Sequence, residues 1–307
     1  MKCVIRDSAD GIILQRYIVP TSDWGFKRLF GTEANKDVLI GLLNKLIDDR
    51  EVKDVKFLER DLLLPVGEGR EMSFDVYCEC QDGSRVIVEM QNYARPNFID
   101  RSLVYTSASI VENYLYNRSK GYRVQKVYLI AITGDTLFKE VEGRPVRLAF
   151  CNKDSEKTQV LNDKILHIFI ELPKFADDIG SLNPDSEFLD KFAVALKTMA
   201  ESHERPEVMD DEMLVKLYRA ADTKRYSEDD KDTYTSNVMN QLEYEATLWD
   251  FREEGLAEGL EKGLATGLAE GSEKRAREIA AKLKAQNIAT DIIATCTGLT
   301  AEAVAAL

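Results

Sequence analysis

Two apolar runs joined by a short polar turn place the strongest constraint on the fold of this chain. Apolar residues predominate in residues 72–80 and in the centre of residues 85–92, and Gln81-Asp82-Gly83-Ser84 separates the two segments. An Asp-Gly pair between two such runs is a strong signal for a β-hairpin. We therefore predict two neighbouring antiparallel strands here, and the remaining elements must build a sheet around them.

The flanking segments predict the helices and the other strands. Helical spacing of apolar residues indicates helices within residues 23–49, broken at Gly31-Thr32 with Thr32 as an N-cap, and over residues 98–117. The order helix, three strands, helix, strand indicates an α/β fold built on an α+β mixed sheet. Everything beyond residue 185 is expected to be helical. The further strands are expected near 55–65, 127–132, 146–151 and 165–172.

The composition excludes several kinds of binding site and several cellular locations. The chain has 54 acidic and 41 basic residues and a formal net charge of -13, so any contact with DNA must be local. Five cysteines without CxxC spacing predict neither a disulfide framework nor a zinc cluster, and two distant histidines leave the chemistry to carboxylates. No apolar run reaches the roughly 20 residues that span a bilayer, and no signal-peptide core is visible. A cytoplasmic protein without membrane association is expected.

The predicted hairpin carries the residues that could do chemistry. Asp75 lies in the first strand, and Glu89 and Gln91 lie two apart in the second, so they face the same side. Hydrolysis of a phosphodiester needs carboxylate oxygens gathered around a divalent cation. A two-residue turn would pair Asp75 with Met90, whereas one extra residue would pair it with Glu89. We predict the longer loop or a bulge.

Asp75 and Glu89 interrupt apolar runs, and this can be interpreted in two ways. A buried carboxylate without a cation or hydrogen-bond partners is costly, so a positive charge should lie between the two. Spacing alone leaves it equally open that both carboxylates point to solvent on the open face of an antiparallel sheet.

Four motifs in the first half of the chain form a recognisable set. They are DWGFKRLFG at residues 23–31, Asp75, Glu89-Met90-Gln91, and Arg101 with Tyr105 in the next predicted helix. Together they resemble the PD-(D/E)XK nuclease family transposases and the related recombination-promoting nucleases. The resemblance covers roughly residues 20–170, and the glycine-rich tail is also similar to tails in that family. It implies a restriction-endonuclease-like αβββαβ core followed by an all-helical C-terminal region.

The resemblance also implies roles for the site residues. Asp75 and Glu89 would bind Mg²⁺, for which Mn²⁺ could substitute, together with the backbone carbonyl of Met90. Gln91 stands where a lysine is usual and cannot accept a proton near neutral pH, so it would orient the attacking water. Deprotonation would then fall to the metal or to a phosphate oxygen. Glu33 matches the position of a further acidic ligand, although a helix dipole also favours a glutamate there.

Positive charges near these motifs are candidate DNA contacts. Lys27 and Arg28 could meet phosphate, although solvated surface charge is their ordinary explanation. Residues 95–126 contain six basic and two acidic side chains, which makes them the best candidate for a phosphate-facing patch. The basic residues of this segment are Arg95, Arg101, Arg118, Lys120, Arg123 and Lys126.

A repeat with a period of four occupies the C-terminal part of the chain. Glycines recur at 255, 259, 263, 267 and 271, each followed by leucine except the last. A period of four drifts about 40° per step around a helix, and each glycine costs roughly 1 kcal/mol relative to alanine. The helix is therefore marginal unless another helix packs on it. We predict a homo-oligomer in which repeats of different subunits pair; a semi-flexible helical linker is the alternative.

These observations predict three regions and one leading function. The regions are a nuclease-like domain at 1–175, a helical extension at 176–254, and the repeat with a helix-turn-helix-like tail at 255–307. The final helix, near residues 301–307, has no side chain suited to reading a base edge. The leading function is that of a Mg²⁺-dependent DNA endonuclease that hydrolyses phosphodiester bonds and could promote recombination or transposition. The alternative is a catalytically inactive nuclease fold that binds nucleic acid or protein through its helical tail, or serves as an oligomeric scaffold.

Overall fold

The structure is a computed structural model that describes residues 6–8, 11–13, 15–62, 72–93, 97–116, 123–151 and 160–307. The chain forms two compact units, Met1–Asn240 and Gln241–Leu307. The three regions predicted from the sequence, with boundaries at 175 and 254, stay a prediction.

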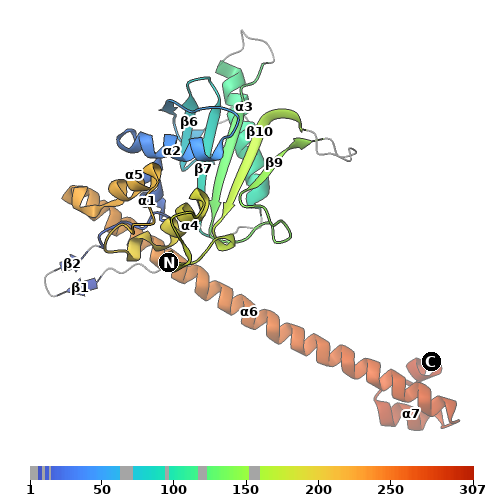
Figure 1. Cartoon of the computed structure of the whole chain (residues 1–307). Helices are drawn as coiled ribbons and strands as arrows, with labels where there is room; N and C mark the ends of the chain where they lie inside the picture. Colours follow the sequence, from blue (N-terminus) through green and yellow to red (C-terminus); the bar gives the residue numbers. More distant parts are fainter. Residues whose placement is uncertain are drawn as a thin grey trace. The chain divides into compact units, whose positions relative to one another are not determined.

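A six-stranded mixed sheet forms the centre of the first unit (Figure 1). β7, β8 and β10 run parallel to one another, and the remaining strands pair antiparallel with their neighbours. The predicted order of helix, three strands, helix and strand is confirmed. In spatial order the strands are β3 (Val55–Phe57), β6 (Val76–Cys80), β7 (Arg85–Gln91), β8 (Val127–Thr133), β10 (Val160–Glu171) and β9 (Val146–Cys151).

Four short strands form two small separate ladders. The run predicted near 55–65 splits into β3 and β4, and the run at 72–80 splits into β5 and β6. The second break falls at Asp75, whose amide donates to the side chain of Glu89 instead of joining the ladder. The ladders consist of β1 (Arg6–Ser8) with β2 (Gly11–Ile13) and of β4 (Asp61–Leu62) with β5 (Met72–Ser73).

A three-residue loop connects β6 and β7. The amide of Cys80 donates to the carbonyl of Ser84 at 2.8 Å, and the amide of Gly83 donates to the carbonyl of Cys80 at 2.9 Å. Gly83 has φ +83°, a left-handed conformation that glycine adopts without steric cost. The longer loop predicted from the sequence is confirmed.

This loop sets the register of the hairpin. Val76 lies opposite Val88, and Glu79 lies opposite Arg85. Continuing the register by one residue places Asp75 opposite Glu89. Directly opposed residues of an antiparallel pair point to the same face, so the two carboxylates share one side of the sheet.

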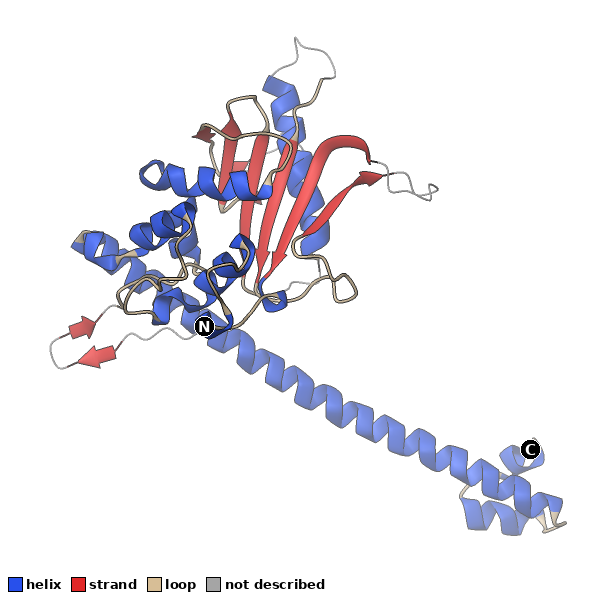
Figure 2. Cartoon of the chain, in the orientation of Figure 1, coloured by secondary structure: helices blue, strands red, loops and turns tan. Residues whose placement is uncertain are grey.

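Helices cover both faces of the sheet (Figure 2). One long helix, α3, lies on one face, and the opposite face is covered by several shorter helices. The helices that lie wholly within this unit are α1 (Asp23–Phe30), α2 (Lys36–Leu46), α3 (Phe98–Tyr116), α4 (Phe188–Thr198) and α5 (Glu212–Ala221), with short 3₁₀ turns at Glu33–Asn35, Leu172–Lys174, Ile179–Ser181, Met199–Glu201 and Thr223–Arg225.

The first helices show how local sequence sets the boundaries. Ser22 caps α1, because its Oγ accepts a hydrogen bond from the amide of Gly25 at 3.1 Å. The predicted break at Gly31-Thr32 is confirmed. Thr32 is the N-cap of the following 3₁₀ turn, but its hydroxyl donates to the carbonyl of Arg28 at 3.0 Å and makes no capping hydrogen bond.

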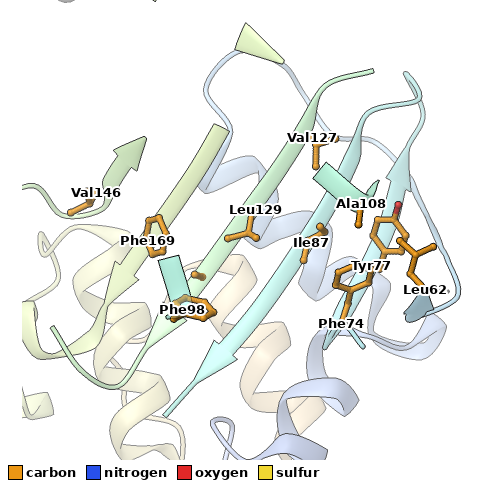
Figure 3. Packing of buried hydrophobic residues seen from close by; sticks show 11 residues of the cluster. Leu62, Phe74, Tyr77, Ile87, Phe98, Ala108, Val127, Leu129, Val146 and Phe169 are labelled. Atoms are coloured by element: carbon orange, nitrogen blue, oxygen red, sulfur yellow. The ribbon is translucent and has the colours of Figure 1, made fainter. Parts of the chain in front are cut away.

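The face under α3 holds one hydrophobic cluster (Figure 3). Tyr77, Ile87, Leu129 and Phe169 of four adjacent strands pack against Phe98 and other residues of α3. Burying one such side chain contributes about 1.5–3 kcal/mol. The intervening residues of β7 and β8 are buried as well, so these parallel strands are covered on both faces.

The segment before α1 is tied to the end of α5 and the beginning of α6 (Glu228–Ala285). The amide of Ile18 donates to the carbonyl of Ala221 at 3.1 Å, and Arg16 forms a salt bridge of 3.1 Å with Asp222. The amide of Val19 donates to the hydroxyl of Tyr234 at 2.9 Å. α1 therefore begins from a fixed anchor.

The second unit contains the repeat and a small helical end. The predicted tail helices are confirmed as the end of α6, α7 (Thr290–Thr297) and α8 (Ala301–Ala305). Ala280, Ile293 and Val304 form their own small core, and α7 ends at Gly298 with φ +72°. The repeat is helical throughout, and its leucines are exposed. Of the helices that the structure describes, none combines the length and the apolar character needed to cross a membrane.

Candidate active site

Asp75 and Glu89 meet at the end of the hairpin that is distant from its loop. The amide of Asp75 donates to Oε1 of Glu89 at 3.2 Å, and Oδ2 of Asp75 accepts from the amide of Met90 at 2.9 Å. Only 3% of Glu89 is exposed, and 19% of the Asp75 side chain. The alternative in which both carboxylates point freely to solvent does not describe this arrangement.

Burial and mutual repulsion act on both carboxyl groups. Burial raises the pKa of Asp75, and its hydrogen bond from Met90 opposes this only in part. Burial, followed by the negative charge of Asp75, raises the pKa of Glu89 to about 8. Two neighbouring buried carboxyls that resist ionisation form a site in which a cation would be strongly stabilised.

Two cationic side chains flank the pair. Nζ of Lys27, in α1, lies 3.8 Å from Oδ1 of Asp75 and 2.6 Å from Oδ1 of Asp23. The charge of Arg101, in α3, lowers the pKa of Asp75 and of Glu89, although less than burial raises them. The guanidinium of Arg101 lies near two aromatic rings, 5.0 Å from the centroid of Phe98 and 5.6 Å from that of Tyr105.

Packing of α1 against the beginning of β6 brings Lys27 to this place. A Cβ atom added to Gly31 would lie 3.4 Å from Cγ2 of Val76 and 3.6 Å from the backbone oxygen of Asp75. The end of α1 therefore packs directly on the beginning of β6, and a Cβ atom there would also come within 2.8 Å of the carbonyl oxygen of Lys27, which favours glycine. Lys27, one turn earlier in α1, then reaches the carboxylates.

Gln91 and the carbonyl of Met90 are hydrogen-bonded to each other. Nε2 of Gln91 donates to the backbone oxygen of Met90 at 3.0 Å. Gln91 is half-buried at the end of β7, and its own carbonyl accepts from the amide of Gly134 at 2.8 Å. The side chain therefore stays at the carboxyl end of β7, two residues after Glu89.

Glu33 is not brought to the carboxylate pair. It lies in the 3₁₀ turn before α2, where its side chain is 71% exposed and forms an ion pair of 3.5 Å with Lys36. Among the residues that the structure describes, no three Asp, Glu, His or Cys side chains gather into a group that could hold a metal ion. A protein site for a cation would thus consist of Asp75, Glu89 and backbone oxygen.

Several of the proposed DNA contacts are engaged within the protein. Arg28 pairs with Asp230 at 3.2 Å, and Lys126 pairs with Asp49 at 2.5 Å, so neither side chain is a free phosphate contact. Arg123 is exposed. The remaining members of the predicted patch, Arg95, Arg118 and Lys120, lie outside the described residues.

Two features of this region were not recognised from the sequence. The sequence alone suggests a phosphate contact for Lys27, whereas the structure places its Nζ 3.8 Å from Oδ1 of Asp75. Nothing in the sequence pattern assigns Asp23, the second partner of Lys27, to the site. The spacing of four residues between them, within the same motif, was the available signal, because residues four apart on a helix are neighbours.

His167 of β10 is buried under α3 and packs against hydroxyl side chains of that helix. Its Nδ1 and Nε2 atoms each lie 3.3 Å from a hydroxyl oxygen, that of Ser102 and that of Thr106 respectively. Burial lowers the pKa of His167 to about 4, so the ring is neutral at physiological pH.

The donor set suits a hard divalent cation. Carboxylate and carbonyl oxygens are the ligands that Mg²⁺ prefers, and a bound cation would relieve the repulsion between Asp75 and Glu89. Lys27 and Arg101 contribute positive charge from two different helices, and a phosphate group would meet that charge on approach.

Comparison with known protein families gives one match. A family model described as "PD-(D/E)XK nuclease family transposase" matches residues 20–249, which is well over half of the chain. No curated protein and no solved structure shows a significant match. The six-stranded mixed sheet between helices is the restriction-endonuclease-like architecture of this family, and membership suggests a nuclease or recombination role with DNA as the partner. The chain belongs to the PD-(D/E)XK nuclease family transposases.

Proposed function

We propose that this protein is a metal-dependent DNA endonuclease that hydrolyses phosphodiester bonds at Asp75 and Glu89. The observation that supports it most directly is the pairing of these two buried carboxyls across a hairpin, with cationic side chains beside them. A purely structural pair of this kind would be costly, because both carboxylates lose hydration on burial and their negative charges repel each other.

Asp75, Glu89 and the carbonyl of Met90 would hold Mg²⁺, and Mn²⁺ could take its place. When bound, such a cation polarises the phosphate and lowers the pKa of a bound water. The hydrogen bonds from the amides of Asp75 and Met90 hold the two carboxylates in place. This fixes the ligand geometry before any cation or substrate arrives.

Gln91 would orient the attacking water. Its amide nitrogen is held by the carbonyl of Met90, which leaves the amide oxygen as an acceptor for a water hydrogen. Because an amide does not titrate near neutral pH, Gln91 would act by position and not by taking the proton.

DNA would bind through local positive charge, since the chain as a whole is strongly acidic. Lys27 and Arg101 are the best placed of the predicted contacts, because the charge of each already acts on both carboxylates and Lys27 forms an ion pair of 3.8 Å with Asp75. Arg123 is exposed and available, and roles for Arg95, Arg118 and Lys120 stay predictions from the sequence. A cytoplasmic location also stays a prediction.

The function can be tested with the purified full-length chain. Supercoiled plasmid is incubated with Mg²⁺ or Mn²⁺, and with EDTA, for the intact protein and for Asp75→Asn and Glu89→Gln. Calorimetric titration with Mg²⁺ measures metal binding independently of cleavage. We expect metal-dependent nicking or linearisation that both variants lose by at least about a hundred-fold.

Glu79→Gln provides the matched control. Glu79 is a carboxylate of the same hairpin that pairs with Arg85 at 2.9 Å, close to the loop. Its loss should leave cleavage and metal binding nearly unchanged. Absence of cleavage by folded intact protein that still binds DNA or a protein partner would favour the non-catalytic alternative, which the acidic charge and Gln91 also favour.

We further propose that the repeat in α6 pairs with the same segment of a second copy. Leu256, Leu260, Leu264 and Leu268 are 58–74% exposed, and a Cβ atom added to any repeat glycine would meet nothing within 4 Å. Residues 241–262 carry seven acidic and two basic side chains, and residues 263–285 carry three acidic and five basic ones. Opposite charges would face each other if two such helices ran antiparallel.

Light scattering on the full chain checks this association. Leu260→Lys together with Leu264→Lys should convert the oligomer to a monomer, whereas Glu258→Ala on the same helix should leave it intact. A mass equal to that of one chain for the unmodified protein, across the micromolar range, would contradict the proposal and support the linker alternative.

A further inference from the structure

We infer that Lys27 is a catalytic residue that binds the reacting phosphate itself, and is not a general contact to the DNA backbone. This inference rests on the proposed function and specifies how the site handles its substrate. It begins from the position of Nζ, which lies between two carboxylates at 2.6 Å and 3.8 Å.

The geometry leaves Lys27 able to accept a new partner. An ammonium group has three donors, and among the described residues Nζ makes one hydrogen bond, to Asp23. The distance of 3.8 Å to Asp75 is an ion pair but too long for a hydrogen bond. A phosphate oxygen held near Asp75 could therefore receive a hydrogen bond from Lys27 without breaking the contact to Asp23.

The partial exposure of the Lys27 side chain also suits a contact to bound substrate. Its side chain is 28% exposed, and that of Asp75 is 19% exposed, so both reach solvent from a mostly buried site. A cation that is partly shielded from water stabilises developing negative charge more strongly than one on an open surface. Arg101 acts from α3, whereas Lys27 acts from α1 beside Asp75, so the two charges are placed independently.

The opposing explanation is that Lys27 only stabilises α1. Asp23 and Lys27 are four residues apart on one helix, and such a pair contributes about 0.3–0.5 kcal/mol. That explanation accounts for the contact to Asp23. It does not account for the approach to Asp75, which depends on the packing of Gly31 against β6.

The effect of Lys27→Met on cleavage rate and on DNA affinity distinguishes three roles for Lys27. These are a contact to the reacting phosphate, a contact to the DNA backbone, and stabilisation of α1. If Lys27 binds the reacting phosphate, the rate of cleavage at saturating protein falls by about a hundred-fold or more. The affinity for a short DNA duplex is measured by fluorescence anisotropy in Ca²⁺, with EDTA-treated protein as the reference. It should change by less than about three-fold in Lys27→Met. Lys27→Arg, which retains the charge, should recover a measurable part of the rate.

A small substrate sharpens the test. Bis(p-nitrophenyl) phosphate is a phosphodiester without flanking phosphates, so a residue that contacts only the DNA backbone cannot affect its hydrolysis. Lys27→Met should reduce hydrolysis of this compound as it reduces cleavage of plasmid. Urea unfolding of Lys27→Met shows whether the fold is retained.

Lys36→Met is the control, because Lys36 lies in α2 and pairs with Glu33 and Asp54 away from the carboxylates. Equal cleavage by the intact protein and Lys27→Met, with Glu89→Gln inactive, would overturn the inference and leave the proposed function standing. A fall in DNA affinity without a fall in the saturated rate would overturn it too. No metal-dependent cleavage by the intact protein would instead overturn the proposed function.

Discussion

The amide of Asp75 donates a hydrogen bond of 3.2 Å to the carboxylate of Glu89, and so the backbone of one site residue positions the side chain of the other. This bond removes Asp75 from the strand ladder and turns its own side chain toward the amide of Met90. The site is therefore built into the hairpin, and changes in either strand should affect both carboxylates.

Glu89→Gln should reduce the pH dependence of the stability of the metal-free protein. The folded pKa of Glu89, about 8, is higher than its ordinary value of 4.5, so between these values the folded state retains a proton that the unfolded state has lost. Stability then falls as pH rises through this window, by up to about 1.4 kcal/mol per pH unit. Urea unfolding in EDTA at pH 5, 6.5 and 8 measures the slope, and an identical slope in the variant would contradict the assignment.

Mg²⁺ should stabilise the protein more at pH 8 than at pH 6. Binding requires both carboxyls to be ionised, and the raised pKa of Glu89 means that a proton must leave at pH 6. We expect the apparent affinity to increase by up to about tenfold per pH unit below pH 8. Thermal unfolding with and without Mg²⁺ at both pH values tests this, with Asp75→Asn as the variant that should not respond. A shift that is equal at both pH values would argue against Glu89 as a ligand.

His167→Gln should reduce acid sensitivity. The pKa of His167 is lowered from 6.5 to about 4, so between these values the unfolded state binds a proton that the folded state excludes. The contribution of His167 therefore makes stability rise with pH from about 4 to 6.5, opposite in sign to that of Glu89. Unfolding measured at pH 4.5 and 6.5 should show a smaller loss on acidification in the variant. His203→Gln serves as the control, because His203 is exposed.

Shortening the hairpin loop should destroy the site while retaining the strands. Replacing Gln81-Asp82-Gly83-Ser84 by Asn-Gly would place Cys80 opposite Arg85 and Asp75 opposite Met90, so that Asp75 and Glu89 lie on opposite faces. We expect cleavage and Mg²⁺ binding to be lost by at least about a hundred-fold, with circular dichroism largely retained. Gln81→Ala keeps the loop length and should retain activity, although it removes the hydrogen bond from Gln81 to Glu51. Full activity in the shortened protein would mean that the register is set elsewhere.

Gly25→Ala should destabilise the protein by about 1–3 kcal/mol. A Cβ atom at Gly25 would collide with the carbonyl oxygen of Val19 and lie 2.6 Å from Oγ of Ser22, the cap of α1. Gly255→Ala is the matched change in open space and should stabilise the helix by up to about 1 kcal/mol. Urea unfolding compares the two, and equal midpoints would show that the start of α1 tolerates a side chain.

Much of the hairpin could be predicted because its information is local. The strand period of two, the Asp-Gly turn and the positions of Asp75 and Glu89 together determine the register, and the structure agrees. The break at Asp75 could not be predicted, because it depends on where a side chain on the next strand places its oxygen.

The contacts of the charged side chains could not be predicted from the sequence, because their partners are distant along the chain. Arg28 meets Asp230, and Lys126 meets Asp49, pairs that form only when helices and sheet edges have packed. Lys27 contacts Asp75 for the same reason, since the contact depends on α1 crossing the beginning of β6. A sequence shows which residues carry charge, but the packing decides which of them remain available to a substrate.

The anchoring of residues 16–19 on residues 221–234 also has a practical consequence for protein engineering. The backbone leading into α1 and the backbone leaving α5 lie side by side, joined by the contacts of Arg16 with Asp222 and of Ile18 with Ala221. A domain whose first and last anchored segments adjoin tolerates relocation of its termini, because a short linker can close the ring. The first unit should therefore still fold as a circular permutant in which a short linker joins these two segments and an exposed loop is opened. In such a permutant α1 no longer lies near the start of the chain.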